Sequence, residues 1–556
     1  MKKRLITLFL SSLMILNCFV GCSPKPGIIK DNNEERGCAS IAEKYESKLD
    51  SNNYGDSSVM YCVEAECCDE AAAPMFATVS YGTDNYNTMD YNTENYDYIE
   101  ANGFCDAFLS PLSTFSADVD TASYSNVRRM LNNGYSIENI PDGAVRTEEF
   151  LNYFSYDYSG PEAGEPFGVN AQIAKCPWNP DHDLLMLGLQ TEAVDFSDAA
   201  DSNIVFLIDV SGSMYDDNKL PLLIQSFELM IDNLSEKDTV SIVTYASGNE
   251  VVIEGVPASD KDTICEALES LQAGGSTNGA GGIVTAYELA EENFISGGNN
   301  RVIIATDGDF NVGLTNESDL HDLITEEKDN GIYLSCLGFG MGNYNDVTME
   351  TLADDGNGNY AYIDSISEAN KVLVEELGAN MVTVAKDVKL QIEFNPEYVS
   401  EYRLIGYENR VMDAEDFDDD TKDAGEIGAG HSVTVMYEIV PAGENNTDDD
   451  DLKYQDSTVN DYAKNTDEWC TLSVRYKEPE SDSSELLEYY FGNDDYTDSP
   501  SNDFVFASCV AEYAMVLTES EYLADGSLAH VQDILDDLNL NDQYKEEFKT
   551  LVDVTY

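Results

Sequence analysis

A group of small oxygen-bearing side chains follows the first strongly apolar segment in the middle of the chain. Residues 204–208 (IVFLI) predict a buried strand, and the chain continues as Asp209-Val210-Ser211-Gly212-Ser213. Alternate residues near a strand end share a side, so we expect Asp209, Ser211 and Ser213 to surround one point. One carboxylate and two hydroxyls are hard donors that suit Mg²⁺, Mn²⁺ or Ca²⁺. Short acidic, Ser-rich turns are common after strands, so a structural turn without metal is the alternative.

Two further loops carry donors of the same type. Thr277 lies in the flexible sequence Gly-Gly-Ser-Thr-Asn at 274–278, and Asp307 follows a second apolar run at 302–305. In open α/β sheets, ligands bind outside the carboxyl ends of the strands. We therefore expect Thr277 and Asp307 to join Asp209 at one edge of the sheet.

The five residues Asp209, Ser211, Ser213, Thr277 and Asp307 resemble the metal-ion-dependent adhesion site of von Willebrand factor type A domains. The pattern of that site is DxSxS, then a Thr, then an Asp, and all five positions match. The resemblance implies that Ser211, Ser213 and sometimes Thr277 bind the ion directly, whereas Asp209 and Asp307 often act through water. It also implies a sixth position that accepts an acidic side chain from a protein partner. Mg²⁺ is the expected cation, with Mn²⁺ or Ca²⁺ as alternatives.

Residues 202–377 alternate between buried strands and amphipathic helices. This order predicts an α/β domain with a doubly wound, mainly parallel sheet that helices cover on both faces. The expected helices are 220–234, 260–271, 279–292, 317–330 and 347–352, and the expected strands are 204–208, 239–245, 251–253, 302–305, 332–337 and 360–363.

The regions on either side of this domain show strand patterns and additional helices. A helix is expected after Thr121, ending at Asn133-Gly134, and another within 145–154. Strands are expected within 167–194 and at 388–394, 402–407, 432–439 and 470–476, followed by helices in 504–551. We expect the strands before residue 202 and after residue 385 to combine into one β-rich unit from which the α/β domain projects.

Parts of these flanking regions also resemble known sequences. Residues 113–158, with STFSADVDTASYSNVRRMLNNG, and residues 403–441, with LIGYENR, are similar to the terminal regions of a family of bacterial von Willebrand-type lipoproteins. The resulting domain prediction is a lipoprotein signal peptide at 1–21, an acidic Tyr/Asn-rich tether at 22–100, an N-terminal flanking domain at 101–201, the von Willebrand type A domain at 202–378, and a C-terminal β-rich plus helical domain at 379–556.

The N-terminus has the features of an export signal. Lys2, Lys3 and Arg4 precede an apolar run at 5–20, which is too short and too interrupted for a comfortable membrane span. The sequence Phe-Val-Gly-Cys at 19–22 resembles a bacterial lipobox, which implies lipidation of Cys22; an ordinary signal peptide is the alternative. The protein is then expected outside the cytoplasm, at the cell surface or in the periplasm, held to the membrane by the lipid anchor only.

Charge and composition exclude several classes of function. The 556 residues include 107 Asp and Glu against 29 Lys and Arg, a formal net charge of −78, which repels phosphate backbones and excludes a nucleic-acid binder. The 4 His are scattered, and the HExxH, GxSxG and Walker lysine motifs are absent, so we expect neither an enzyme nor a nucleotide site.

Two other groups of residues could hold a metal but fit it poorly. Cys62, Cys67 and Cys68 lack a nearby His and the paired CxxC spacing, and the pairing of the 12 Cys cannot be assigned from spacing alone. The acidic run at 416–423 has Thr421 where a calcium loop needs Gly and Ile427 where it needs Glu, so a solvated loop is expected.

The sequence therefore predicts a surface-anchored lipoprotein that binds a protein partner through a divalent cation, in adhesion or assembly. A metal-assisted hydrolase that uses the same cation to activate water is one alternative. The other is a structural scaffold in which an acidic loop of the chain itself fills the sixth position.

Overall fold

The computed structural model describes residues 93–194, 196, 199–277, 279–308, 317–443, 459–479 and 481–555. The predicted signal peptide, Cys22, the cysteines at 38–68 and most of the predicted tether lie outside these described residues. None of the helices in the described ranges is both long and apolar enough to cross a membrane.

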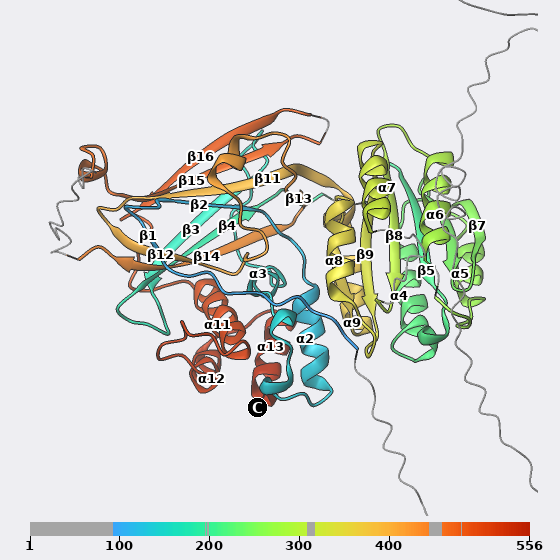
Figure 1. Cartoon of the computed structure of the whole chain (residues 1–556), viewed down its shortest axis with the longest axis horizontal. Helices are drawn as coiled ribbons and strands as arrows, with labels where there is room; N and C mark the ends of the chain where they lie inside the picture. Colours follow the sequence, from blue (N-terminus) through green and yellow to red (C-terminus); the bar gives the residue numbers. More distant parts are fainter. Residues whose placement is uncertain are drawn as a thin grey trace, which may run out of the picture. The chain divides into compact units, whose positions relative to one another are not determined.

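The loops that carry the predicted site belong to a six-stranded sheet of order β10-β9-β8-β5-β6-β7 (Figure 1). Every neighbouring pair in this sheet is parallel except β6 and β7, which pair antiparallel at one edge. Because Ile208 of β5 pairs with Ala305 of β8, these two central strands end at the same edge of the sheet. The prediction of a mainly parallel sheet is confirmed. The strands are β5 (Ser202–Asp209), β6 (Thr239–Tyr245), β7 (Asn249–Pro257), β8 (Asn299–Thr306), β9 (Ile332–Phe339) and β10 (Tyr360–Ile363).

Helices cover both faces of this sheet, as a doubly wound fold requires (Figure 1). Phe206 of β5 faces one core and stacks on Phe227 with 4.1 Å between ring centroids, whereas its neighbour Leu207 enters the other core. Both faces of β5 are buried, which explains why its sequence is continuously apolar. One core packs α4 (Leu220–Asn233), α5 (Lys261–Glu269), α9 (Ile366–Asn370) and α10 (Leu377–Met381), and the other packs α6 (Ala280–Glu292), α7 (Glu317–Asp329) and α8 (Asp346–Asp355).

Strands from both flanking regions combine into two further sheets. One has the order β1-β12-β14-β4-β3, and the other has β13-β11-β15-β16 with β2 also paired to β11. A shared core that includes Leu187 of β4 and Leu390 of β11 fills the space between the two sheets. The expected union of the flanking strands is therefore confirmed. These strands are β1 (Cys105–Asp106), β2 (Leu112–Ser116), β3 (Gly168–Lys175), β4 (Asp183–Gln190), β11 (Thr383–Phe394), β12 (Val399–Ile405), β13 (Gly425–Gly428), β14 (Ser432–Pro441), β15 (Glu468–Lys477) and β16 (Ser484–Gly492).

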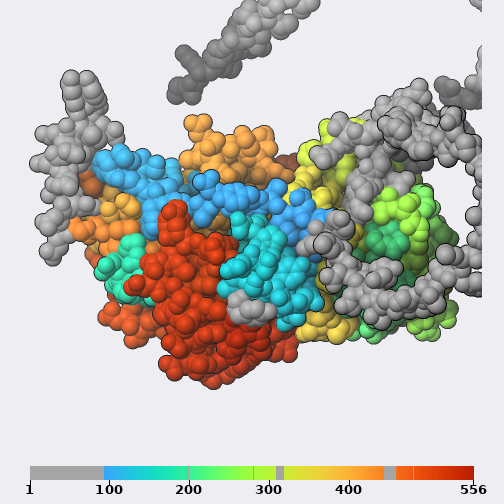
Figure 2. Space-filling model, turned by 60° about the horizontal axis from the view of Figure 1, so that its bottom comes forward, coloured from blue at the N-terminus to red at the C-terminus, as the bar shows by residue number. Residues whose placement is uncertain are grey.

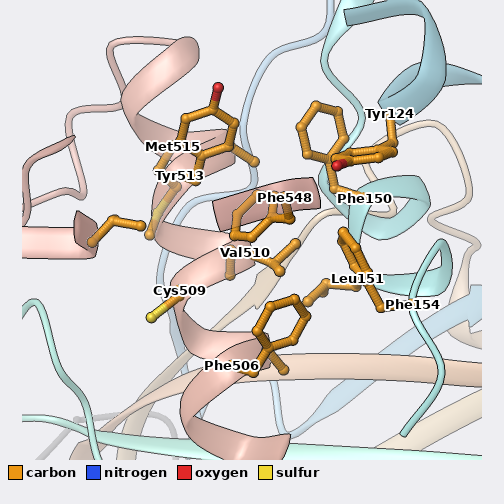
Figure 3. Close-up of a cluster of buried hydrophobic side chains, with 14 of the residues drawn as sticks. Tyr124, Phe150, Leu151, Phe154, Phe506, Cys509, Val510, Tyr513, Met515 and Phe548 are labelled. Atoms are coloured by element: carbon orange, nitrogen blue, oxygen red, sulfur yellow. The ribbon is translucent and has the colours of Figure 1, made fainter. Parts of the chain in front are cut away.

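The helices of the two flanking regions also share one core. Figure 3 shows aromatic side chains from both ends of the chain packed together, and Figure 2 shows the C-terminal helices lying directly against the N-terminal ones. The ring of Phe154 lies 5.4 Å from that of Phe548 and 5.0 Å from that of Phe506, between centroids. The flanking regions, separate in sequence, thus form one packed unit. Its helices are α2 (Ala122–Asn132), α3 (Thr147–Asn152), α11 (Asn502–Leu517), α12 (Leu528–Asp537) and α13 (Gln543–Val554).

The last residues of the predicted tether are bound to the α/β domain. The N–H groups of Thr93 and Asn95 donate to the carbonyls of Gly342 and Tyr344, at 2.8 and 2.9 Å. The Glu94 carboxylate forms an ion pair of 2.8 Å with Arg129 of α2. We call residues 93–97 the strap. The folded part of the chain therefore begins before residue 101, because a buried ion pair and backbone hydrogen bonds hold the strap in place.

Candidate metal centre

The DxSxS residues lie together at the carboxyl end of β5. Asp209 and Ser211 are buried, whereas Ser213 is exposed. The Oγ atoms of Ser211 and Ser213 are 2.9 Å apart, and either hydroxyl could donate to the other. The N–H of Ser211 donates to Asp209 Oδ1 at 2.8 Å. Three of the five predicted site residues therefore lie in one compact turn that these hydrogen bonds hold together.

The end of β8 is joined to this turn through a hydrogen bond. The hydroxyl of Thr306 donates to Asp209 Oδ2 at 3.0 Å, and Asp307 follows directly, with a fully buried side chain. Asp307 is close enough to Asp209 for the two negative charges to repel each other. The structure thus brings the fourth predicted residue to the edge at which Asp209 lies.

The loop that carries Thr277 is hydrogen-bonded to the same turn. The N–H of Gly274 donates to the carbonyl of Val210 at 2.7 Å, and the N–H of Gly212 donates to the carbonyl of Gly275 at 3.1 Å. Gly275 has a φ of +86°, which favours glycine at this close approach. Thr277 lies two residues further along this loop and is partly exposed. Three separate loops therefore meet, as the spacing predicts.

Burial of the site disfavours the ionised form of its Asp209 carboxylate. Desolvation raises the pKa of Asp209 to about 6, and the charge of Asp307 adds to that effect, while hydrogen bonds from Ser211 and Thr306 oppose it. Two carboxylates that are both removed from water favour a nearby positive charge. A divalent cation would supply that charge, and the surrounding hydroxyls are donors that Mg²⁺ and Mn²⁺ accept.

Lys219 lies beside the site, although no local sequence pattern marks it as a site residue. Its ammonium donates to Asp307 Oδ2 at 2.8 Å and to Asn343 Oδ1 at 3.1 Å, and the residue is only 4% exposed. In sequence it is a lysine after an acidic loop at the start of a helix, a place where lysines are ordinarily solvated. The contact joins residues 88 positions apart, so no local pattern indicates it.

Of the two alternative metal sites, only the acidic run at 416–423 lies in the described part of the chain; Cys62, Cys67 and Cys68 lie outside it. No group of three or more His, Cys, Asp and Glu in the described ranges has the arrangement of a metal site. Within the acidic run, Asp423 pairs with Lys328 at 2.8 Å, and Asp418 pairs with Arg475. The run is thus held partly by basic side chains, in addition to being largely exposed as expected.

The histidines and cysteines also lie outside the candidate centre. His182, His321 and His530 pair with Glu438, Asp355 and Glu512, respectively, at 2.6–2.8 Å, and His431 lies in the turn before β14. Among the described cysteines, the thiols without a disulfide are Cys105, Cys176, Cys265, Cys336, Cys470 and Cys509.

The parallel sheet, its helical layers and the acidic and hydroxyl side chains at its carboxyl edge define a von Willebrand factor type A protein. The family model described as "von Willebrand factor type A domain" matches residues 203–376, and the one described as "von Willebrand factor" matches residues 90–186. A third, described as "Uncharacterized protein YfbK, C-terminal", matches residues 379–556. Domains of the type A class generally mediate metal-dependent protein interactions.

A relative that matches most of the chain identifies the family. The "Uncharacterized protein YfbK" of Escherichia coli (strain K12) is 40% identical over 454 residues, which cover 80% of this chain and 78% of that protein. The chain therefore belongs to the bacterial YfbK-like family of proteins that contain a von Willebrand factor type A domain.

Two other proteins are also similar to this chain, one over a small part of its own length and the other with low sequence identity. Human "Inter-alpha-trypsin inhibitor heavy chain H4" is 28% identical over 164 residues, which cover 28% of this chain and 17% of that protein. The solved structure "von Willebrand factor type A from Catenulispora acidiphila" has a TM-score of 0.39 and 15% identity, over 72% of this chain and 91% of that chain.

Proposed function

We propose that this protein binds a protein partner through a divalent cation held by Asp209, Ser211, Ser213, Thr277 and Asp307. The observation that carries the proposal is the convergence of two buried carboxylates and the Ser211–Ser213 hydroxyl pair at one sheet edge. When bound, the cation would attract an acidic side chain of the partner and so join the two surfaces. Mg²⁺ is the cation we propose first, with Mn²⁺ or Ca²⁺ as alternatives.

The residues of the site divide between two tasks. Both oxygens of Asp209 already accept protein hydrogen bonds, from Ser211 N–H and from the Thr306 hydroxyl. That arrangement suits a carboxylate that acts on the ion through water. Ser211 and Ser213 can rotate their hydroxyl hydrogens away and present lone pairs to a cation instead of to each other. We therefore propose the two serines as direct ligands and Asp209 as a charge held behind them.

A binding role agrees better with the surroundings than hydrolysis does. A metal-assisted hydrolase needs a general base near the ion. Beside the proposed ion site lies Lys219, whose ammonium already donates hydrogen bonds to Asp307 and Asn343. Three of the four His form pairs with carboxylates elsewhere in the structure. We therefore propose that the protein is not an enzyme.

We propose in addition that residues 1–21 direct export and that Cys22 carries the lipid anchor. The N-terminal charge pattern and the lipobox-like sequence at 19–22 support this assignment. Mass spectrometry of the N-terminal peptide from a membrane fraction should show an acylated Cys22. A peptide that begins at another residue and carries no lipid would contradict the assignment.

The binding proposal is tested by capture of partners from surface extracts. Wild-type protein is compared in Mg²⁺ and in EDTA, together with Ser211→Ala in Mg²⁺. Ser226→Ala is the matched control, because Ser226 is a buried serine of α4 whose hydroxyl donates to the Leu222 carbonyl. We expect the same partners with wild type and Ser226→Ala in Mg²⁺, and their loss with EDTA and with Ser211→Ala. Equal recovery in all four samples would refute the cation bridge.

A further inference from the structure

We propose that Lys219 is a fixed positive charge within the metal centre and has two effects. It lowers the affinity of the centre for the free cation, and it leaves the cation-loaded centre with a net positive charge that attracts an acidic partner. This inference rests on the proposed function and specifies how the same site is tuned. The contact that supports it is the 2.8 Å salt bridge between Lys219 Nζ and Asp307 Oδ2, in which the side chains are 5% and 0% exposed.

The side chain of Lys219 is buried and closely packed against its neighbours. Lys219 directly precedes α4, and its carbonyl accepts the N–H of Leu223 at 2.8 Å. Its aliphatic part runs against Gly340, just beyond β9, where an added Cβ would lie 2.4 Å from both Cγ and Cε of the lysine. Gly340 has a φ of +77°, so both its conformation and the space favour glycine. Lys219 is therefore a packed part of the site and not a mobile surface lysine.

The second acceptor of the ammonium is held by the strap. Asn343 Oδ1 lies 3.1 Å from Lys219 Nζ, and Asn343 stands between two residues whose backbones bond to the strap. Gly342 donates its N–H to Glu94 at 2.8 Å, and Glu94 is in turn paired with Arg129. The ammonium of Lys219 thus has two fixed acceptors, Asp307 in the site and Asn343 in the loop whose backbone is hydrogen-bonded to the strap.

The positive charge of Lys219 has opposite effects on the binding of the cation and on the binding of the partner's carboxylate. Ionised Asp209 and Asp307 with Lys219 give the site a net charge of about −1, so a bound divalent ion leaves about +1. Without Lys219 the two carboxylates would balance the charge of the ion, so the loaded site would attract a partner carboxylate less strongly. Since Lys219 and the ion are both positive and share Asp307, each weakens the binding of the other.

The test is a calorimetric titration, in which Mn²⁺ alone is added to the purified full mature chain. We expect Lys219→Met to bind Mn²⁺ at least tenfold more tightly than wild type, and Lys219→Arg to stay within about threefold of wild type, since it keeps the charge. Lys545→Met is the matched control, because Lys545 forms a similar 2.8 Å pair with Asp503 in the flanking helices. Its Mn²⁺ affinity should equal that of wild type.

Each outcome decides the inference. Unchanged or weaker Mn²⁺ binding by Lys219→Met would overturn the role of Lys219 while leaving the cation site itself in place. Tighter binding by Lys219→Arg as well would show that packing and not charge is responsible. Absence of Mn²⁺ binding in wild type and every variant would overturn the proposed function and this inference together. If Lys219→Met does not fold, Lys219→Gln, whose amide can still donate to Asp307, is titrated under the same criteria.

Discussion

The hydroxyl of Thr306, the last residue of β8, donates a 3.0 Å hydrogen bond to Oδ2 of Asp209, the last residue of β5. The bond ties two neighbouring parallel strands together at the edge where their loops form the candidate metal centre. With Ser211 N–H on the other oxygen, it fixes the Asp209 carboxylate from both sides. The centre is therefore arranged by the ends of the strands, which are rigid, and not by the loops alone.

Thr306→Val should weaken cation binding without disrupting the sheet. Valine has nearly the same shape but leaves Asp209 Oδ2 without its hydrogen bond, so we expect a loss of about 1 kcal/mol in the free energy of unfolding. We also expect roughly threefold to tenfold weaker Mn²⁺ binding by calorimetry, since about 1.4 kcal/mol corresponds to a factor of ten. The control is Thr351→Val on the exposed side of α8, which should match wild type. Unchanged Mn²⁺ affinity in Thr306→Val would mean that the hydrogen bond from Thr306 does not position Asp209 for the ion.

Lys219→Met should destabilise the protein when no cation is present. The substitution leaves the buried Asp307 carboxylate without its ammonium, and breaking a buried pair in this way costs about 3 kcal/mol. Urea unfolding in EDTA should show this loss, and saturating Mn²⁺ should recover most of it. A variant that is as stable as wild type in EDTA would show that Asp307 does not depend on Lys219.

Glu94→Gln should loosen the strap. Burial opposes ionisation of Glu94, but hydrogen bonds and the charge of Arg129 outweigh it, so the pKa of Glu94 is lowered. The variant keeps the shape but loses the charge that faces Arg129, at an expected cost of about 2 kcal/mol. Hydrogen exchange at the Gly342 and Asp346 amides should accelerate, because both donate to the strap.

The matched control for the strap is Glu100→Gln, a change at an exposed glutamate that follows the strap in the sequence. It should leave exchange at both amides unchanged. If Glu94→Gln also leaves exchange unchanged, the backbone hydrogen bonds hold the strap without the ion pair.

Protonation of His431 should contribute to acid sensitivity. Burial lowers the pKa of His431 to about 4 in the folded protein, against about 6.5 in the unfolded chain. Between these values the unfolded state binds more protons, so this contribution to stability is complete above pH 6.5 and is lost as the pH falls toward 4. The full shift corresponds to at most about 3 kcal/mol, and to less here because the residue is partly exposed.

The measurement for His431 is the free energy of unfolding at several pH values between 4 and 7. His431→Gln should show a shallower decline over this window than wild type. His321→Gln, at an exposed histidine paired with Asp355, serves as the control and should follow the wild-type decline. Equal slopes for wild type and His431→Gln would exclude this histidine as the source.

Local patterns were sufficient for the parallel sheet and the DxSxS turn. β5 is apolar throughout because both its faces are covered, and Asp209, Ser211 and Ser213 are close in sequence. The convergence of the Asp307 and Thr277 loops was inferred from sheet geometry and family resemblance. The structure places both loops against the Asp209 turn, although cation binding itself stays a prediction.

Features that depend on distant partners were not predictable in the same way. Lys219 is polar in sequence but buried in space, because Asp307 and Asn343 accept its protons. The strap has a tether-like composition, yet Glu94 is held by Arg129. β16 (Ser484–Gly492) was also missed, since as an edge strand it lacks a regular buried face.

The most direct test of the central claim is a calorimetric titration of Mn²⁺ into wild type, Ser211→Ala and Ser226→Ala. We expect one ion per chain for wild type and Ser226→Ala, with binding weakened by about tenfold or more in Ser211→Ala, because a proposed direct ligand is lost. Equal Mn²⁺ affinity in all three proteins, or no binding by wild type, would contradict the central claim.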